Sequence, residues 1–227
     1  MDILLIAGLW LDGTAWHDVL PELTALGHRP VPITLPGQGD GTASATLDDQ
    51  LAAVTAAVDA ADGKPLVVGH SAACTMAWLA ADRRPDGVAG VALIGGLLPS
   101  DGDRYADLFG YTDGVMPFPG WDPFEGPDAA DLDRDTRRRI EATMVTVPET
   151  VTKGVVRYHD ERRFEVPLRV VCPEFTPDQA REWVAAGESP EVAAAKRVEY
   201  VDIESGHWPM YTRPAELARL LVAPFRA

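Results

Sequence analysis

Short apolar runs alternate with longer amphipathic segments along the first hundred residues of the chain. The run from Asp2 to Ala7 is typical of a buried strand, and apolar residues at helical spacing follow it. A second strand is expected at about Pro30 to Leu35, and a helix from Thr46 to Ala61 begins at a threonine cap. Such alternation predicts a parallel sheet with helices on both faces. We therefore expect an α/β protein with a mainly parallel, doubly wound sheet.

The alternation is interrupted between about residues 101 and 165. This segment is rich in Pro, Gly, Asp and aromatic residues, and only Asp131 to Thr143 has a helical pattern. It is too short to build a generous core of its own. We expect a small helical lid inserted into a single domain that spans residues 1–227. After the insertion the alternation resumes with strands at Leu168 to Cys172 and Val198 to Ile203, a helix at Thr176 to Ala186 between them, and a closing helix from about Arg213 to Leu221.

The formal net charge of −15 argues against nucleic acid and anionic membrane surfaces as partners, because lysine and arginine contacts dominate binding to both. No apolar run reaches the roughly 20 residues that cross a bilayer, and the opening residues lack a basic leader. A cytoplasmic location is the expectation. Cys74 and Cys172 lie in apolar stretches and are expected to be buried and reduced. The oligomeric state stays open, a homodimer included.

Ser71 lies in the pentapeptide Gly69-His70-Ser71-Ala72-Ala73. A short apolar strand, Pro65 to Val68, precedes it, and a helix begins at about Ala72. This strand–turn–helix context is the one that a nucleophile elbow requires, although Ala73 replaces the last glycine of the G-x-S-x-G pattern. The pattern predicts Ser71 as a nucleophile.

A serine hydroxyl needs a base within hydrogen-bond reach. His207 follows the last predicted strand in a loop just before the final helix, so it is expected at the same carboxyl edge of the sheet as Ser71. His17, His28 and His159 lie in or beside early helices or in the insertion. We expect His207 to be the base.

An oxyanion that forms during acyl transfer needs preorganised N–H donors. One is normally the amide directly after the nucleophile, here Ala72. The other is expected from the loop after the first strand, where Leu9 is the first choice and Trp10 the alternative.

The order of these motifs resembles the α/β-hydrolase superfamily, and within it the branch of plant methylesterases and hydroxynitrile lyases. Gly8-Leu9-Trp10 stands where that branch carries its H-G-A/G-x loop, with Ala7 in place of the histidine. The turn PGQGD, the elbow GHSAA, the segment GGLLPSDG and the loop SGHWPM follow in the family's order. The resemblance covers the chain except the insertion. It implies an α/β-hydrolase fold that is trimmed at its amino end.

The resemblance also implies an acid just beyond the strand Leu168 to Cys172, in the chain order Ser, acid, His. Phe175 stands where the family's aspartate aligns, and the adjacent Glu174 is favoured as the residue that orients His207. Asp178 has the pattern of a first-turn helix acid. Asp101 or Asp103 from the neighbouring strand, or a Ser–His dyad with no acid, stay open.

Aromatic residues gather in the insertion, and ligand pockets are mostly apolar. Trp10, Phe118, Trp121 and Trp208 are the candidate substrate-binding residues. The expected partner is a small molecule, a neutral and moderately hydrophobic ester or lactone. No cofactor and no metal are expected, because no His/Cys cluster has ligand spacing. Two alternatives stay open: a lyase or cyclisation catalyst that uses the same Ser–His pair, and a hydrolase-like sensor with little turnover.

Overall fold

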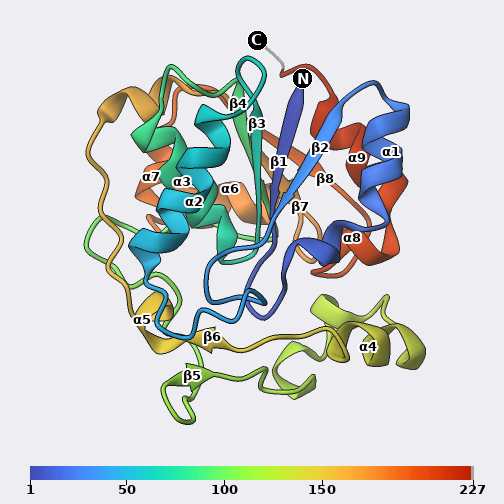
Figure 1. Cartoon of the computed structure of the whole chain (residues 1–227). Helices are drawn as coiled ribbons and strands as arrows, with labels where there is room; N and C mark the ends of the chain where they lie inside the picture. Colours follow the sequence, from blue (N-terminus) through green and yellow to red (C-terminus); the bar gives the residue numbers. More distant parts are fainter. Residues whose placement is uncertain (226–227) are drawn as a thin grey trace.

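The computed structural model describes residues 1–225 of the chain, and a six-stranded sheet with the order β2-β1-β3-β4-β7-β8 lies at its centre. Every strand is parallel to its neighbours. The carboxyl ends of the strands therefore meet at one edge, the lower one in Figure 1. The strands are β1 (Asp2–Ile6), β2 (Arg29–Ile33), β3 (Leu66–His70), β4 (Gly90–Ile94), β7 (Leu168–Cys172) and β8 (Val198–Asp202).

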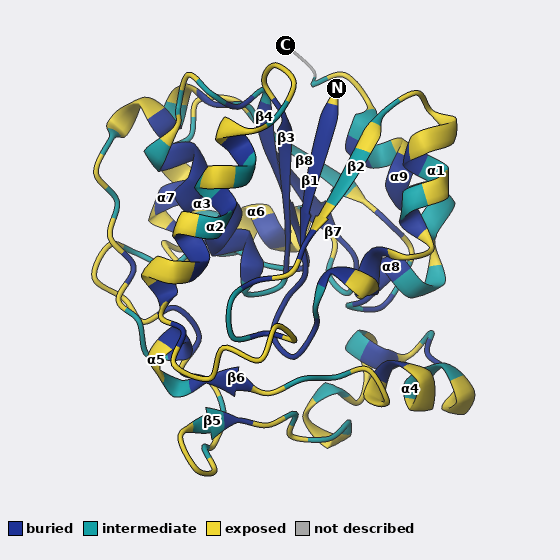
Figure 2. Cartoon of the chain, in the orientation of Figure 1, coloured by how far each residue is buried: buried dark blue, intermediate teal, exposed yellow. Residues whose placement is uncertain are grey.

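Side chains alternate between the two faces of the sheet, and each face is covered by helices. In β1, Ile3 and Leu5 pack into one apolar cluster, whereas Leu4 and Ile6 pack into the other. Figure 2 shows that the strands are mostly buried while the outer helix faces are exposed. The first cluster is covered by α1 (Val19–Ala25), α8 (Pro209–Thr212) and α9 (Pro214–Val222), and the second by α2 (Leu47–Asp59), α3 (Ala73–Arg83), α6 (Pro177–Ala185) and α7 (Pro190–Ala194). The predicted doubly wound sheet is confirmed.

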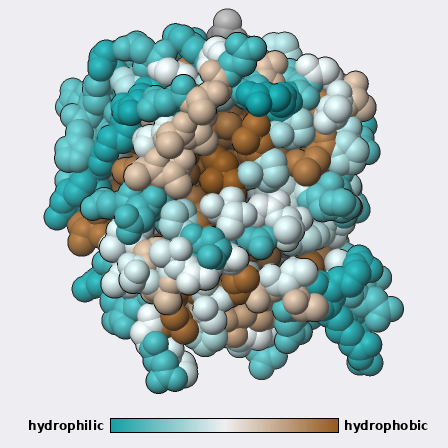
Figure 3. Space-filling view, viewed as in Figure 1, coloured by the Kyte–Doolittle hydropathy of each residue, from teal (hydrophilic) through white to brown (hydrophobic). Residues whose placement is uncertain are grey.

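β2 is an edge strand, and it carries prolines at alternate positions, Pro30 and Pro32. Proline lacks an N–H group, so such an edge offers fewer donors to a further strand. Figure 3 shows an apolar area on this side of the molecule, where β1 and β2 run between α2 and α1 in Figure 1. Within residues 1–225 no helix is long and apolar enough to cross a bilayer.

The segment of residues 101–165, here called the insertion, runs across the carboxyl edge of the sheet (Figure 1). It contains a two-stranded antiparallel sheet of β5 (Val115–Met116) and β6 (Val147–Pro148), and the helices α4 (Arg134–Glu141) and α5 (Glu149–Thr152). The helix predicted at Asp131 to Thr143 is shorter, because the Asp133 side chain caps its first turn by accepting from the Thr136 N–H. The insertion therefore lies over the edge where Ser71 and His207 were expected.

Candidate active site

Ser71 occupies the sharp turn between β3 and α3. Its φ of +56° lies in the left-handed region that non-glycine residues rarely adopt. The Ser71 N–H donates to the carbonyl of Ile94 in β4 at 2.8 Å, which ties the turn to the neighbouring strand. A Cβ atom on Gly69 would overlap the carbonyl group of Ala73. Glycine at position 69 thus lets the strand and the helix approach closely enough to strain Ser71.

His207 lies in the loop between β8 and α8, and three hydrogen bonds hold it. Its Nδ1 is 2.7 Å from Oε1 of Glu174. Its backbone N–H donates to the carbonyl of Asp128 in the insertion at 2.7 Å. Its own carbonyl oxygen is 2.8 Å from Nε2 of His70. The side chains of His207 and Glu174 are only 12% and 14% exposed, so the pair is shielded from competing water.

Of the carboxylates considered from the sequence, Glu174 is the one that the structure brings to His207. The others have different partners: Asp101 accepts from the Tyr158 N–H, Asp103 from the Ser100 N–H, and Asp178 pairs with Arg181. Glu174 follows β7 directly, at the same edge of the sheet as His207. The described residues include no partner for the second oxygen of Glu174, Oε2, which is buried.

The bend Gly95–Gly96 after β4 separates the elbow from the histidine loop. A Cβ atom on Gly95 would lie 3.1 Å from Nδ1 of His207, and one on Gly96 would lie 2.8 Å from the carbonyl oxygen of Ser71. The histidine loop therefore packs against Gly95, and the elbow packs against Gly96. Among residues 1–225 no hydrogen bond joins the Ser71 hydroxyl to the His207 ring. Such bonds often tighten only when substrate binds.

The loop after β1 lies directly against the elbow, since a Cβ atom on Gly8 would be 2.9 Å from Cβ of Ser71. The backbone N–H groups of Leu9, Trp10 and Ala72 donate to no acceptor within residues 1–225. Trp10 has a φ of +63°. Gln38, which is 1% exposed, donates from Nε2 to the carbonyls of Gly8 and Leu11 at 3.0 Å each and so fixes this loop.

The four candidate substrate-binding residues belong to one aromatic cluster, which joins the insertion to the loops of Leu9 and His207. Phe124 lies 6.0 Å from Trp10 and 5.4 Å from Trp208, measured between ring centroids. Trp208 in turn packs edge-on against His207 at 4.9 Å. The full cluster consists of Trp10, Phe109, Phe118, Trp121, Phe124 and Trp208. It extends from the loop of Leu9 to the loop of His207.

Burial changes the pKa values of titratable groups around His207. Burial lowers the pKa of His70 well below its ordinary value, and the adjacent His207 lowers it further. Burial also raises the pKa of Asp128, with a further rise from Glu174. The Cys74 thiol beneath the elbow has a raised pKa, again because it is buried, so it is not a competing nucleophile. Cys74 and Cys172 are both free and buried, as expected.

Sequence reasoning missed three contributors to this geometry: Gln38, His70 and Asp128. Gln38 lies in the turn PGQGD and His70 in the elbow, so the available signal was their place at the carboxyl ends of β2 and β3. Nothing local marks Asp128, because only its backbone carbonyl makes the contact with the His207 loop.

Comparison with known proteins places the chain among enzymes of one fold. The profile of the alpha/beta hydrolase family matches residues 3–220. Lipase LipV of Mycobacterium tuberculosis is 27% identical over 248 aligned residues, which cover 96% of this chain and 91% of that protein.

Solved structures share the fold at lower identity. An extracellular alpha/beta-hydrolase from a Paenibacillus species has a TM-score of 0.79 at 18% identity and covers all of both chains. A pyrethroid hydrolase from Sphingobium faniae has a TM-score of 0.70 at 24% identity, covering 97% of this chain and 95% of that one. Polyneuridine aldehyde esterase has a TM-score of 0.72 at 16% identity, with 97% of each chain covered.

Proposed function

Because the chain belongs to the alpha/beta hydrolase family, we propose that it is a serine hydrolase that cleaves a neutral, moderately hydrophobic carboxylic ester or lactone through an acyl-enzyme. The observation that carries the proposal is the hydrogen bond between His207 and Glu174, at the carboxyl edge where Ser71 occupies its strained turn. The lipase and esterase names of its relatives support the same reaction class.

The proposed reaction has two half-steps. The Oγ atom of Ser71 attacks the substrate carbonyl carbon while its proton passes to Nε2 of His207, whose Nδ1–H donates to Glu174. The amides of Leu9 and Ala72 donate to the oxyanion. His207 then protonates the leaving alcohol, and the acyl–oxygen bond to that alcohol breaks. A water molecule, deprotonated by His207, then attacks the acyl carbon. The bond between that carbon and the Oγ atom of Ser71 breaks, the acid leaves, and His207 gives the proton to Oγ.

The surroundings of the base favour a neutral substrate. The carboxylate of Glu174 contacts the imidazole, and the electrostatic influence of Asp128 extends to both residues. A substrate with its own carboxylate near the reacting carbonyl would meet like charges in a poorly hydrated site. The aromatic cluster supplies the apolar contacts expected of a pocket for a small ester.

A fluorophosphonate probe tests the nucleophile. We expect one covalent label per wild-type chain, located by mass spectrometry on the peptide that contains Ser71, and none on a Ser71→Ala variant. Ser205→Ala, which removes a hydroxyl from the histidine loop instead of the elbow, is the matched control and should still label.

Turnover is tested separately with p-nitrophenyl esters of increasing acyl length and with lactones. We expect a burst of p-nitrophenol followed by steady hydrolysis. Label on Ser71 with no turnover of any ester or lactone would contradict hydrolysis and favour a lyase, a cyclisation catalyst or a sensor. A wild-type chain that takes no label would remove the basis of the whole proposal.

A further inference from the structure

We propose that His70 is a positioning residue for the catalytic base: it donates from Nε2 to the backbone carbonyl of His207 and thereby fixes the base loop relative to the nucleophile turn. The inference rests on the proposed function. The inference extends the proposed function, because it assigns a role to His70, the residue that precedes Ser71.

The geometry determines which way this hydrogen bond runs. Nε2 of His70 is 2.8 Å from the carbonyl oxygen of His207, a residue 137 positions away in the sequence. A carbonyl oxygen only accepts, so His70 carries its proton on Nε2. The rings of the two histidines lie 4.9 Å apart at 54°. His70 is 1% exposed, and the bond is therefore shielded from water.

The other nitrogen of the His70 ring, Nδ1, is buried and has no partner among the described residues. It faces the loop after β1, because a Cβ atom on Gly8 would lie 3.0 Å from it. The ring thus fills the space between the loop of Leu9 and the loop of His207. One side chain from the elbow separates and supports both loops.

A neutral His70 ring is compatible with a position beside His207. Burial lowers its pKa well below the ordinary value, and the neighbouring His207 lowers it further, so the ring stays neutral near pH 7. During the proposed reaction His207 takes up a proton. A charged neighbour with its ring 4.9 Å away would oppose that protonation, whereas a neutral donor does not.

Of the three hydrogen bonds that hold His207, only the one from His70 begins in the elbow itself. Glu174 follows β7, and Asp128 belongs to the insertion. Loss of either of these two leaves the link between the elbow and the base loop in place. Loss of the His70 donor removes the direct tie between the turn of Ser71 and the loop that carries its base.

Two variants of similar side-chain length test the inference. His70→Gln keeps an N–H donor at similar reach, and His70→Met fills the same space without one. We expect His70→Met to lose about 10- to 100-fold in kcat and in the rate of fluorophosphonate labelling, with KM changed by less than about threefold, because a misplaced base slows chemistry more than binding. His70→Gln should recover at least half of the lost activity on a logarithmic scale. Equal rates for His70→Met and wild type, or equal losses in the two variants, would overturn the inference.

A measurement on the unaltered chain covers the case in which neither variant folds. In a proton–nitrogen NMR spectrum of the wild type labelled with 15N-histidine, His70 should show a protonated Nε2 and an unprotonated Nδ1, and it should stay neutral as the pH is lowered from 8 through its ordinary pKa of 6.5. A neutral ring that carries its proton on Nδ1 and not on Nε2 would refute the proposed contact. This spectrum does not depend on turnover, so a chain that failed to label at Ser71 would overturn the proposed function and still leave the His70 contact to be judged.

Discussion

Gly95 is the residue whose substitution should separate folding from catalysis most clearly. Its φ is +62°, and a Cβ atom there would lie 3.1 Å from Nδ1 of His207 and 3.3 Å from Oε2 of Glu174. The methyl group of Gly95→Ala would therefore press on the His207 ring and on the Glu174 carboxylate. We expect kcat on a p-nitrophenyl ester to fall about tenfold, because the ring must shift by a few tenths of an ångström, less than the about 1 Å misplacement that costs about 100-fold.

Gly63→Ala is the matched control. Gly63 has a φ of +79°, so alanine there carries a comparable backbone strain, but its Cβ atom would meet nothing within 4 Å. Both variants should lose about 1 kcal/mol of unfolding free energy in urea titrations, and only Gly95→Ala should lose activity. Normal kcat in Gly95→Ala would show that the bend does not constrain the base.

Glu174→Gln tests the role of the acid. The amide would keep the size of the side chain, but it would not stabilise the imidazolium that forms on His207, and its N–H₂ group can present a donor to Nδ1 and favour the wrong tautomer. We expect kcat to fall by as much as about 10⁴-fold, the loss seen when a triad aspartate becomes an asparagine. Asp178→Asn, a change in an exposed carboxylate of the same loop region, should leave kcat unchanged.

A fall of less than about tenfold in Glu174→Gln would mean that His207 works without an orienting acid. The same kinetic experiment therefore distinguishes the triad from the Ser–His dyad that the sequence left open.

At this scale the sequence is informative where chemistry has a local pattern. Ser71 is marked by the strand–turn–helix around it, and His207 by its place after the last strand. Glu174 is only one of several carboxylates near strand ends, and the choice depends on how β7 and β8 lie side by side. The contacts of Gln38 and His70 join residues 27 to 137 positions apart, so no local pattern could reveal them.

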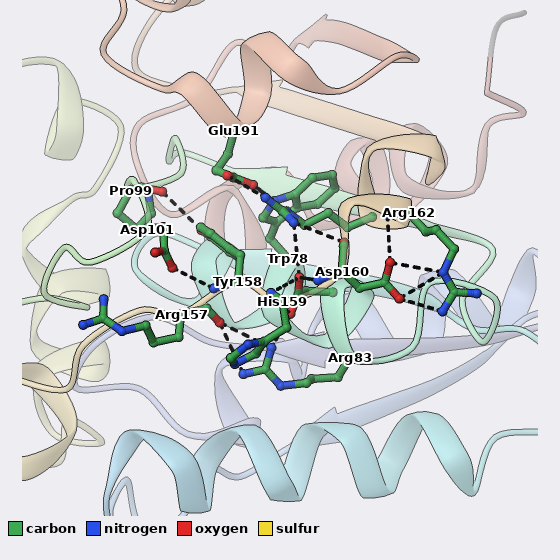
Figure 4. A network of polar contacts seen from close by, with 12 residues as sticks. Trp78, Arg83, Pro99, Asp101, Arg157, Tyr158, His159, Asp160, Arg162 and Glu191 are labelled. Carbon is green, nitrogen blue, oxygen red and sulfur yellow. Dashed lines mark hydrogen bonds and ion pairs between the residues drawn. The ribbon is translucent and has the colours of Figure 1, made fainter.

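At the scale of elements, a buried polar network fixes the end of the insertion to α3 and α7. Figure 4 shows Glu191 and Trp78 on one side of it and Asp160 on the other. The Trp78 indole donates to Glu191 at 2.8 Å, and Arg163 donates to both oxygens of Glu191 at 2.7 and 2.9 Å. Arg163 also bonds Asp82, whose carboxylate accepts backbone N–H groups of the insertion.

Glu191→Ala should destabilise the chain strongly. The substitution leaves Arg163, whose side chain is 8% exposed, without its bidentate partner, and it removes the acceptor of the Trp78 indole. We expect a loss of about 3–5 kcal/mol in unfolding free energy, the usual effect of leaving one member of a buried ion pair alone. Urea denaturation followed by tryptophan fluorescence would measure it.

The double variant Glu191→Leu/Arg163→Met controls for the unpaired charge. Replacing both partners by apolar groups removes a buried cation that would otherwise keep only its contact with Asp82, so the double variant should be more stable than Glu191→Ala. Equal losses in the two would show that packing, and not charge, accounts for the effect.

Helices and strands in which the apolar pattern repeats over many residues were predictable from the sequence. Elements of two residues were not. The strand Leu168–Cys172 has the predicted bounds, and α2 and α6 differ from their predictions by a residue or two at each end. β5 and β6 have two residues each, too few to show any period, and they form because two segments of the insertion that are about 30 residues apart pair with each other. The helix α4, with four arginines, forms the hydrophilic lower right corner in Figure 3.

At the scale of the whole molecule, the parallel sheet brings polar and apolar groups together at the carboxyl edge of its strands. The strands end in a layer where a strained serine and a shielded imidazole lie close to an aromatic cluster, most of which belongs to the insertion. Such a layer excludes water, and it keeps some titratable groups in charge states that they would not hold in an unfolded chain. The stability of the molecule should therefore depend on pH in two separate ranges.

His70 accounts for the upper range. Above its ordinary pKa of 6.5 the ring is neutral in both states, and the histidine adds no pH dependence. As the pH falls below 6.5, the unfolded chain binds a proton that the folded chain, with its lowered pKa, does not bind. Stability should then decrease by about 1.4 kcal/mol per pH unit for this one proton. His28, whose pKa is lowered mainly by burial, adds in the same direction.

The carboxyl groups change the stability of the chain at lower pH than the histidines do. The pKa of Asp2 is lowered mainly by its hydrogen bond with Arg29, and that of Asp40 mainly by the Thr42 N–H, so their contributions are lost only as the pH falls below about 3.8. The raised pKa of Asp128 works the other way and favours the folded state in acid. Between pH 6.5 and the carboxylate range, urea midpoints of the wild type should therefore fall, while those of His70→Gln should fall less steeply, because only the contribution of His28 remains. If the two chains lost stability in parallel over that interval, a neutral, buried His70 would not be the source of the acid sensitivity.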